Sequence, residues 1–219
     1  MSDITRQVAR LLERAQSGHA QEALAAAESA LRDGDRAGMH FVRAVALETL
    51  GEDPIPALGL MVRAAEREGS PGWRACALAT RASERLRLGE EENDEYDVDA
   101  ALRDLSAAET ALLRETDQVA AVNARVGIAV GYLQLRLYEL AGPQYEAAYE
   151  ISAASPEQNG NRAMWLSNLA EMHLLWALEL YQVGESASAE EHTAAAEEFA
   201  VRSAAESCGA DAGTWREMA

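Results

Sequence analysis

The chain has 219 residues, of which 48% are hydrophobic and 5% aromatic, and its net charge at pH 7 is -18. All 19 basic residues are arginines, against 37 acidic residues. An acidic field repels phosphate backbones and anionic lipids, so neither nucleic acid nor a membrane surface is an expected partner. The sequence shows no signal peptide and no apolar run of about 18 residues that could span a bilayer, so we expect a cytoplasmic protein.

The composition predicts an all-α fold. Ala, Leu, Glu and Arg make up about half of the chain, as is typical of long helices, and strand-forming runs of Val, Ile, Thr and aromatic residues are absent. The two cysteines, Cys76 and Cys208, lie far apart in the sequence. We therefore expect two reduced thiols inside a helical protein, because a disulfide framework would need more cysteines.

Helix starts and stops divide the chain into segments. Asp53-Pro54 and Ser70-Pro71 are typical helix starts, and Gly51, Gly89 and Gly184 each follow an apolar segment, where a glycine can end a helix. Between these marks the apolar residues recur with helical spacing. We predict about ten antiparallel helices in five pairs, at residues 3–16, 20–32, 36–50, 54–68, 71–88, 97–114, 117–135, 138–153, 160–183 and 186–207.

An acidic stretch interrupts this pattern at Gly89–Asp97, GEEENDEYD. Its like charges and lack of apolar periodicity predict an irregular surface loop. A calcium-binding loop is the sharper alternative, but the stretch lacks the central glycine and the final glutamate of an EF-hand.

Small residues recur at one position of successive helix pairs. The spacing from Ala23 to Ala57 is 34 residues, and the next two intervals are 44 and 40 residues. Small side chains let antiparallel helices approach closely, while the larger residue between them fills a neighbouring groove. The repeated triplets are Ala23/Ala27/Ala30, Ala57/Met61/Ala64, Ala101/Leu105/Ala108 and Ala141/Tyr145/Ala148.

These positions resemble the tetratricopeptide repeat (TPR) family over about residues 4–207. The fourth pair is most similar, through Ala129, Tyr132, Tyr138, Ala141, Tyr145 and Ala148, and Leu169-Ala170 stands where the family has a leucine-glycine pair. The resemblance implies a solenoid of helix pairs over residues 1–208, whose first helices line a concave groove. Residues 209–219 would then begin a linker or a C-terminal tail.

No constellation of residues predicts catalysis. The four histidines, His19, His40, His173 and His192, are dispersed in the sequence without helical metal-ligand spacing, and we expect His192 to be solvated. A phosphate-binding glycine loop and a G-x-S-x-G nucleophile turn are also absent. We therefore expect a non-enzymatic chain without cofactor or metal.

The predicted groove offers three binding candidates, Arg43, Asn123 and Asn168, whose register places them on or near its inner face. Asn168 occupies the position where peptide-clamping TPR proteins often carry an asparagine that binds the ligand backbone, although the lysines of that clamp are absent here. The expected partner is a peptide or a protein. The alternative is that each of the three residues bonds only to its own scaffold.

Two segments, YLQLRLYELAGPQYEAAYE and WLSNLAEMHLLWALELY, suggest a further resemblance. They are similar to the N-terminal TPR-like regions of actinobacterial signalling proteins such as GGDEF diguanylate cyclases. This resemblance implies a regulatory module whose partner could be a fused C-terminal output domain. A free-standing adaptor, an all-α small-ligand-binding protein or enzyme, and a homodimer remain alternatives.

Overall fold

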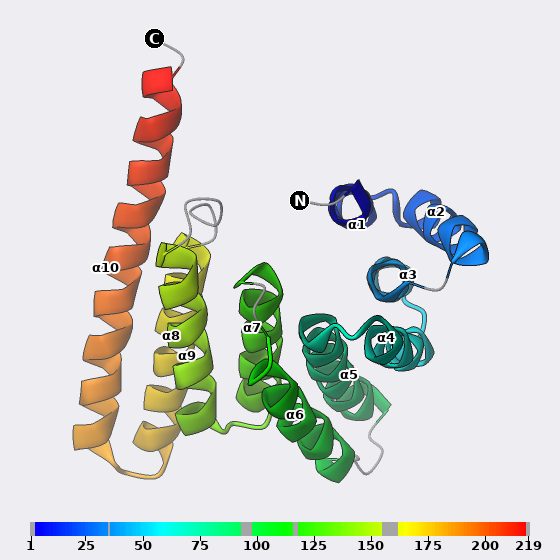
Figure 1. The fold of residues 1–219 in the computed structure, drawn as a ribbon. Coiled ribbons are helices and arrows are strands. Elements are labelled where there is room, and N and C mark those ends of the chain that lie inside the picture. The colour runs from blue at the N-terminus through cyan, green and yellow to red at the C-terminus, as the bar shows by residue number, and fades with distance from the viewer. Residues whose placement is uncertain (1–2, 35, 93–97, 116–117, 155–161, 218–219) are drawn as a thin grey trace. The chain divides into compact units, whose positions relative to one another are not determined.

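The structure is a computed structural model that describes residues 3–34, 36–92, 98–115, 118–154 and 162–217. Within these ranges the chain forms ten helices and no strand, which confirms the all-α prediction for them (Figure 1). The helices are α1 (Asp3–Gln16), α2 (Ala20–Asp33), α3 (Ala37–Thr49), α4 (Ile55–Glu68), α5 (Pro71–Glu92), α6 (Val98–Leu112), α7 (Gln118–Gln134), α8 (Tyr138–Ala154), α9 (Arg162–Gln182) and α10 (Ser186–Glu217).

Most helix boundaries agree with the sequence prediction to within two residues, because the local capping chemistry operates as expected. Gly51 and Gly184 adopt left-handed backbone angles, with φ of 73° and 84°, just after α3 and α9. Only a residue without a Cβ takes up this conformation at little cost. At the start of α4 the Ile55 amide donates a hydrogen bond of 2.8 Å to the Asp53 carboxylate, as a cap should.

Two helices run further than predicted. The prediction that Gly89 ends a helix is wrong, because α5 passes through Gly89 and continues to Glu92. A glycine inside a helix costs about 1 kcal/mol, and the glutamates that follow it are good helix formers. The rest of the predicted acidic loop, residues 93–97, lies outside the described residues. Similarly, α10 continues to Glu217 rather than ending at residue 207.

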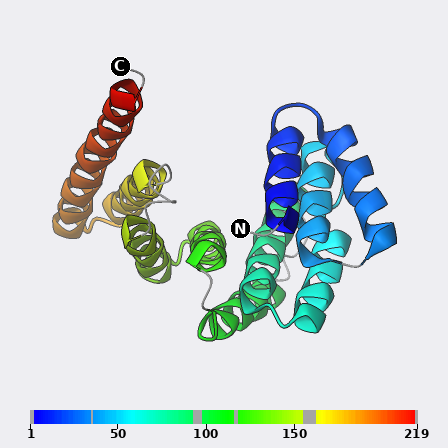
Figure 2. The same cartoon turned by 45° about the horizontal axis from the view of Figure 1, so that its top comes forward.

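The chain divides into two compact units, Met1–Ala120 and Ala121–Ala219, which are described separately below. In unit 1, α1 packs against both α2 and α3, α3 packs against α4, and α5 packs against α4 and α6 (Figure 2). The first three helices share a core built from small and medium-sized side chains: Val8, Leu11, Ala15, Ala23, Ala27, Met39, Val42 and Ala46.

Gly38 allows α1 and α3 to pack at a short distance from each other. Gly38 is buried near the start of α3, and a Cβ added to it would lie 2.8 Å from Cγ2 of Val8. That distance is too short for two carbon atoms in contact. The absence of a side chain at Gly38 therefore permits the observed approach of the two helices.

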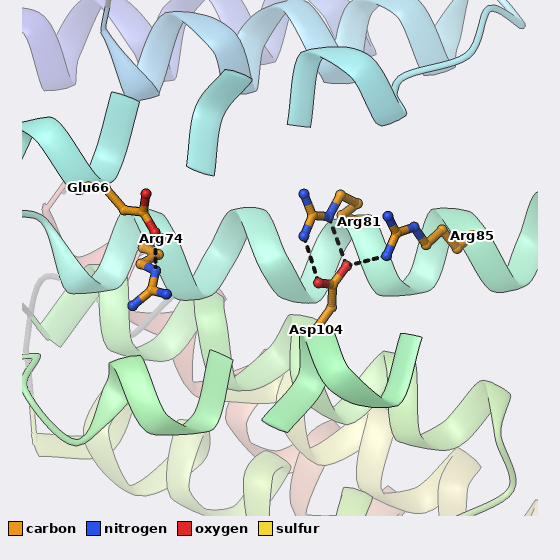
Figure 3. A network of polar contacts seen from close by, with 5 residues as sticks. All are labelled: Glu66, Arg74, Arg81, Arg85 and Asp104. Carbon is orange, nitrogen blue, oxygen red and sulfur yellow. Dashed lines mark hydrogen bonds and ion pairs between the residues drawn. The ribbon is translucent and has the colours of Figure 1, made fainter. Parts of the chain in front are cut away.

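Charged groups join the next helices of unit 1 (Figure 3). Asp104 of α6 accepts hydrogen bonds of 2.8 and 2.6 Å from Arg81 of α5, and a third of 2.8 Å from Arg85. Its side chain is only 9% exposed, so the carboxylate needs these donors to replace water. One turn after the start of α5, Arg74 forms an ion pair with Glu66 of α4 at 3.1 Å.

Unit 2 packs α8 against α9 and α9 against α10. Val122 of α7, Ala148 of α8 and Trp165 of α9 form a small core. Trp165 Nε1 donates to Ser152 Oγ at 3.0 Å, and this hydroxyl donates to the Ala148 carbonyl at 2.8 Å, so the buried polar atoms are satisfied. The predicted close-packing positions in both units are confirmed as buried: Ala101, Leu105, Ala141, Tyr145 and Ala148.

Candidate interaction surface

Arg43, one of the three sequence candidates, lies half-buried on α3 of unit 1. Its Nε is 3.9 Å from a carboxylate oxygen of Glu28 on α2. This distance is an ion-pair contact and not a hydrogen bond, and the buried Nε has no hydrogen-bond partner among the described residues. Whether Arg43 bonds only to its own scaffold or contacts a ligand stays a prediction.

The other two candidates belong to unit 2. Asn123 is exposed on α7, and Asn168 is half-buried on α9. Arg43 lies in the other unit. That all three residues line one groove therefore stays a prediction.

The most distinctive surface of unit 2 is an apolar face on α9. Leu174, Leu175, Leu178 and Tyr181 follow i, i+1, i+4 and i+7 spacing, which places them on one side of the helix. Together with Met164, two to three turns nearer the helix start, they form what we call the α9 apolar face. Their exposed fractions are 49%, 38%, 50%, 47% and 47% respectively, so about half of each large side chain is in contact with water.

The opposite side of α9 holds this face in place. Trp165, Leu166, Leu169 and Met172 are at most 5% exposed, and α8 and α10 both pack against the helix. A helix that is apolar on all sides is usually buried on all sides. Within the described residues no helix is long and apolar enough to cross a membrane. The exposure of the α9 apolar face therefore calls for another explanation.

Behind the face, five aromatic rings from three helices stack in a row that we call the aromatic ladder. Tyr138 of α8 stacks on Trp176 of α9 with ring centroids 5.6 Å apart, and Trp176 stacks on His192 of α10 at 3.8 Å. His173 of α9 then stacks on both His192 and Phe199 of α10, at 5.1 and 5.5 Å. All of these pairs are within 25° of parallel, so the ladder ties α8 and α10 to α9.

The two histidines of the ladder also share a hydrogen bond. Their Nδ1 atoms are 2.9 Å apart, so one imidazole donates Nδ1–H and the other accepts it. Burial, and then the neighbouring His192, lower the pKa of His173 below its ordinary value. The four histidines are dispersed in the sequence, as stated above, but the α9–α10 hairpin brings His173 and His192 together. The expectation that His192 is simply solvated is therefore wrong, because its ring stacks in the ladder and bonds His173.

A metal site is not visible at this pair. Among the described residues, no group of three or more His, Cys, Asp or Glu side chains is placed to hold a metal ion. Within the ladder, the three inner rings of Trp176, His192 and His173 each stack on at least two others. We interpret it as the internal support of the α9 apolar face.

Arginines extend the row of stacked rings toward the start of α9. Arg202 lies over the rings of Phe199 and Tyr149, and Arg162 lies over Tyr149 and forms an ion pair with Glu206. Hydrogen bonds from Arg162 and Arg202 lower the pKa of the Tyr149 hydroxyl. Both guanidinium groups are thus engaged inside unit 2.

Unit 1 also carries open clefts. One of about 410 Å³ lies at the start of α5 and is lined by Ser70, Arg74, Thr110 and Arg114 among others. Two arginines at a helix N-terminus resemble an anion site. However, Glu66 lines the same cleft and forms an ion pair with Arg74, so a carboxylate of the chain itself already neutralises part of that charge.

The α9 apolar face has a signal in the sequence. The segment WLSNLAEMHLLWALELY is apolar nearly all round the helix, which exceeds what one buried side needs. The ladder had no such signal, since its partners come from three helices. No protein-family model matches the chain, and neither a curated protein nor a solved structure matches it.

Proposed function

We propose that the chain is a non-catalytic interaction module that binds a helical segment of a partner protein on the α9 apolar face. The observation that carries this proposal is the exposure of about half of each of five large apolar side chains on one rigid helix. Leu174, Leu175, Leu178 and Tyr181 form the contiguous part of the face, and the exposed Ser167 and Glu171 lie between them and Met164. Contiguous apolar surface marks interaction sites. A partner helix would remove these side chains from water, and each buried CH₂ contributes about 0.8 kcal/mol.

A helix is the natural ligand for this face. The spacing of Leu174, Leu178 and Tyr181 matches one side of a helix, and a second amphipathic helix packs against such a stripe with its own i, i+3, i+4, i+7 residues. The ladder and the buried side of α9 fix the position of the stripe, which reduces the entropy lost on binding.

A TPR-like arrangement of the helices also belongs to this proposal. The packing of each helix in unit 1 against its neighbours, and of α1 against α3, supports a stack of helix pairs. A role as the regulatory part of a cytoplasmic bacterial signalling protein, with a partner either fused or separate, accords with such a scaffold.

The experiment uses an amphipathic helical peptide of about 18 residues, with leucines at i, i+3, i+4 and i+7 and glutamines elsewhere. We expect fluorescence anisotropy to show saturable binding to the wild-type chain. The double variant Leu174→Ser/Leu178→Ser should bind at least about tenfold more weakly, because two central apolar contacts are lost.

The control is Leu113→Ser, which alters a side chain of unit 1 that is 86% exposed. It should bind like the wild type, and circular dichroism should show equal helix content for all three proteins. Absence of binding to the wild type, or equal binding by the double variant, would reject the proposal.

A further inference from the structure

We propose that the partner helix on the α9 apolar face is basic, with lysines or arginines flanking its apolar stripe. This inference rests on the function proposed above and specifies the partner. It comes from the charges that surround the face.

Unit 2 has a large excess of acidic residues. Residues 121–219 contain 14 Asp and Glu, five Arg and no Lys. Glu171 is exposed three positions before Leu174, so it lies on the same side of α9 as the apolar face. Glu185 is exposed directly after the turn that ends α9, four residues beyond Tyr181. A carboxylate therefore lies beyond each end of the cluster formed by Leu174, Leu175, Leu178 and Tyr181.

Four arginines of unit 2 have side chains that the structure describes, and each of them is engaged away from Glu171 and Glu185. Arg136 pairs with Glu179 at 2.7 Å, and Arg125 donates to Gln144 at 2.9 Å. Arg162 and Arg202 are engaged with Glu206 and the aromatic rings, as described above. Apart from Arg162 at its start, α9 contains no Arg or Lys. Glu171 thus lies between Met164 and the cluster, and Glu185 follows the cluster in the chain, so the four apolar side chains of the cluster have a carboxylate on each side.

This charge pattern selects among occupants. An acidic helix, an anionic lipid surface or a second copy of this chain, with its own charge of -18, would bring like charges together. A helix with basic residues on both sides of an apolar stripe would place opposite charges near Glu171 and Glu185 while covering the leucines. The exposed apolar side chains and the neighbouring carboxylates therefore favour the same ligand, which is a basic amphipathic helix.

The experiment compares three peptides that share one leucine pattern and differ only in the flanking residues, which are Lys, Gln or Glu. Anisotropy titrations at about 50 mM and about 300 mM NaCl separate the apolar from the electrostatic contribution. We expect the Lys peptide to bind the wild type at least about tenfold more tightly than the Glu peptide, with a smaller difference at high salt.

Charge-reversal variants locate the effect. Glu171→Arg/Glu185→Arg should lose most of the preference for the Lys peptide. Glu146→Arg/Glu197→Arg makes the same change in net charge at exposed positions of α8 and α10 and should keep the preference. The Leu174→Ser/Leu178→Ser variant keeps every carboxylate and should bind none of the peptides well. This variant separates binding at the α9 apolar face from nonspecific electrostatic attraction to the acidic chain.

The outcomes distinguish the two proposals. Binding of the Gln peptide without any preference for Lys over Glu would overturn the basic partner and leave the interaction function standing. An equal effect of both charge-reversal pairs would overturn it as well, since only net charge would matter. A wild-type dimer that Leu174→Ser/Leu178→Ser converts to a monomer, measured by light scattering, would assign the face to a second copy instead.

Discussion

In unit 1, a carboxylate holds α6 to α5 by accepting hydrogen bonds from two arginines, whereas in unit 2 stacked rings hold α10 to α9. Asp104 bonds with Arg81 and Arg85, which are charged at every physiological pH. The contact between His173 and His192 depends on one shared proton. The two helix–helix contacts should therefore respond differently to substitution and to pH.

The largest effect should come from breaking the ionic contact. Asp104→Ala leaves two partly buried guanidinium groups without their carboxylate, which should lower the free energy of unfolding by about 3 kcal/mol. Urea denaturation measures this loss. Asp99→Ala, at an exposed position on the same helix, should change stability by less than about 0.5 kcal/mol. Similar losses for both variants would show that Asp104 adds nothing beyond surface charge.

An intermediate effect should come from cutting the aromatic ladder. Trp176→Ala removes the ring that stacks on Tyr138 and His192, and we expect a loss of about 2 to 3 kcal/mol because the side chain is only half-buried. Trp176→Phe should recover part of the loss, since a smaller ring can still stack. If thermal melts of the wild type and Trp176→Ala coincide, the ladder does not hold α9 and α10 together.

The smallest effect should be the pH dependence of unit 2. Because the pKa of His173 is lowered in the folded state, the unfolded chain binds a proton there first, near pH 6.5. Stability from this residue is therefore present above about pH 6.5 and is lost as the pH falls through the folded pKa. Melting temperatures measured from about pH 7.5 to 5.5 should fall less steeply in His173→Phe than in the wild type.

A substitution at a non-titrating residue provides the control for the pH experiment. Leu113→Phe introduces the same side chain at an exposed position of unit 1 without removing an imidazole, and it should leave the slope as in the wild type. A slope unaltered by His173→Phe would mean that the carboxylates alone produce the pH dependence.

Much of the fold followed from local sequence rules. Burial of Ala101, Ala141 and Tyr145 could be predicted because small and large residues alternate with helical spacing, and the Asp53 cap could be predicted because its chemistry involves neighbours in sequence. The error at Gly89 arose because a glycine permits a helix end without requiring one.

The candidate surface was less accessible to sequence reasoning. Apolar spacing predicts which sides of α9 can be buried, but which apolar side remains exposed depends on where α8 and α10 pack. His173 and His192 belong to different helices, so their contact depends on the register of the hairpin. The role of Asn168 rests on a resemblance to a repeat family and stays a prediction.

The length of α10 has a consequence for the end of the chain. The helix packs along α9 as far as the ion pair between Arg162 and Glu206, and its backbone continues as helix over residues 207–217, about 16 Å further (Figure 1). An isolated peptide of this length would be mostly unfolded, because the first turn is costly to form. Here the packed part of α10 has already formed that first turn, so each added residue needs only a propagation step. Residues 207–217 are therefore helical because the preceding part of α10 is helical. A single proline at about residue 207 would interrupt this propagation, and the residues after it should lose their helical structure.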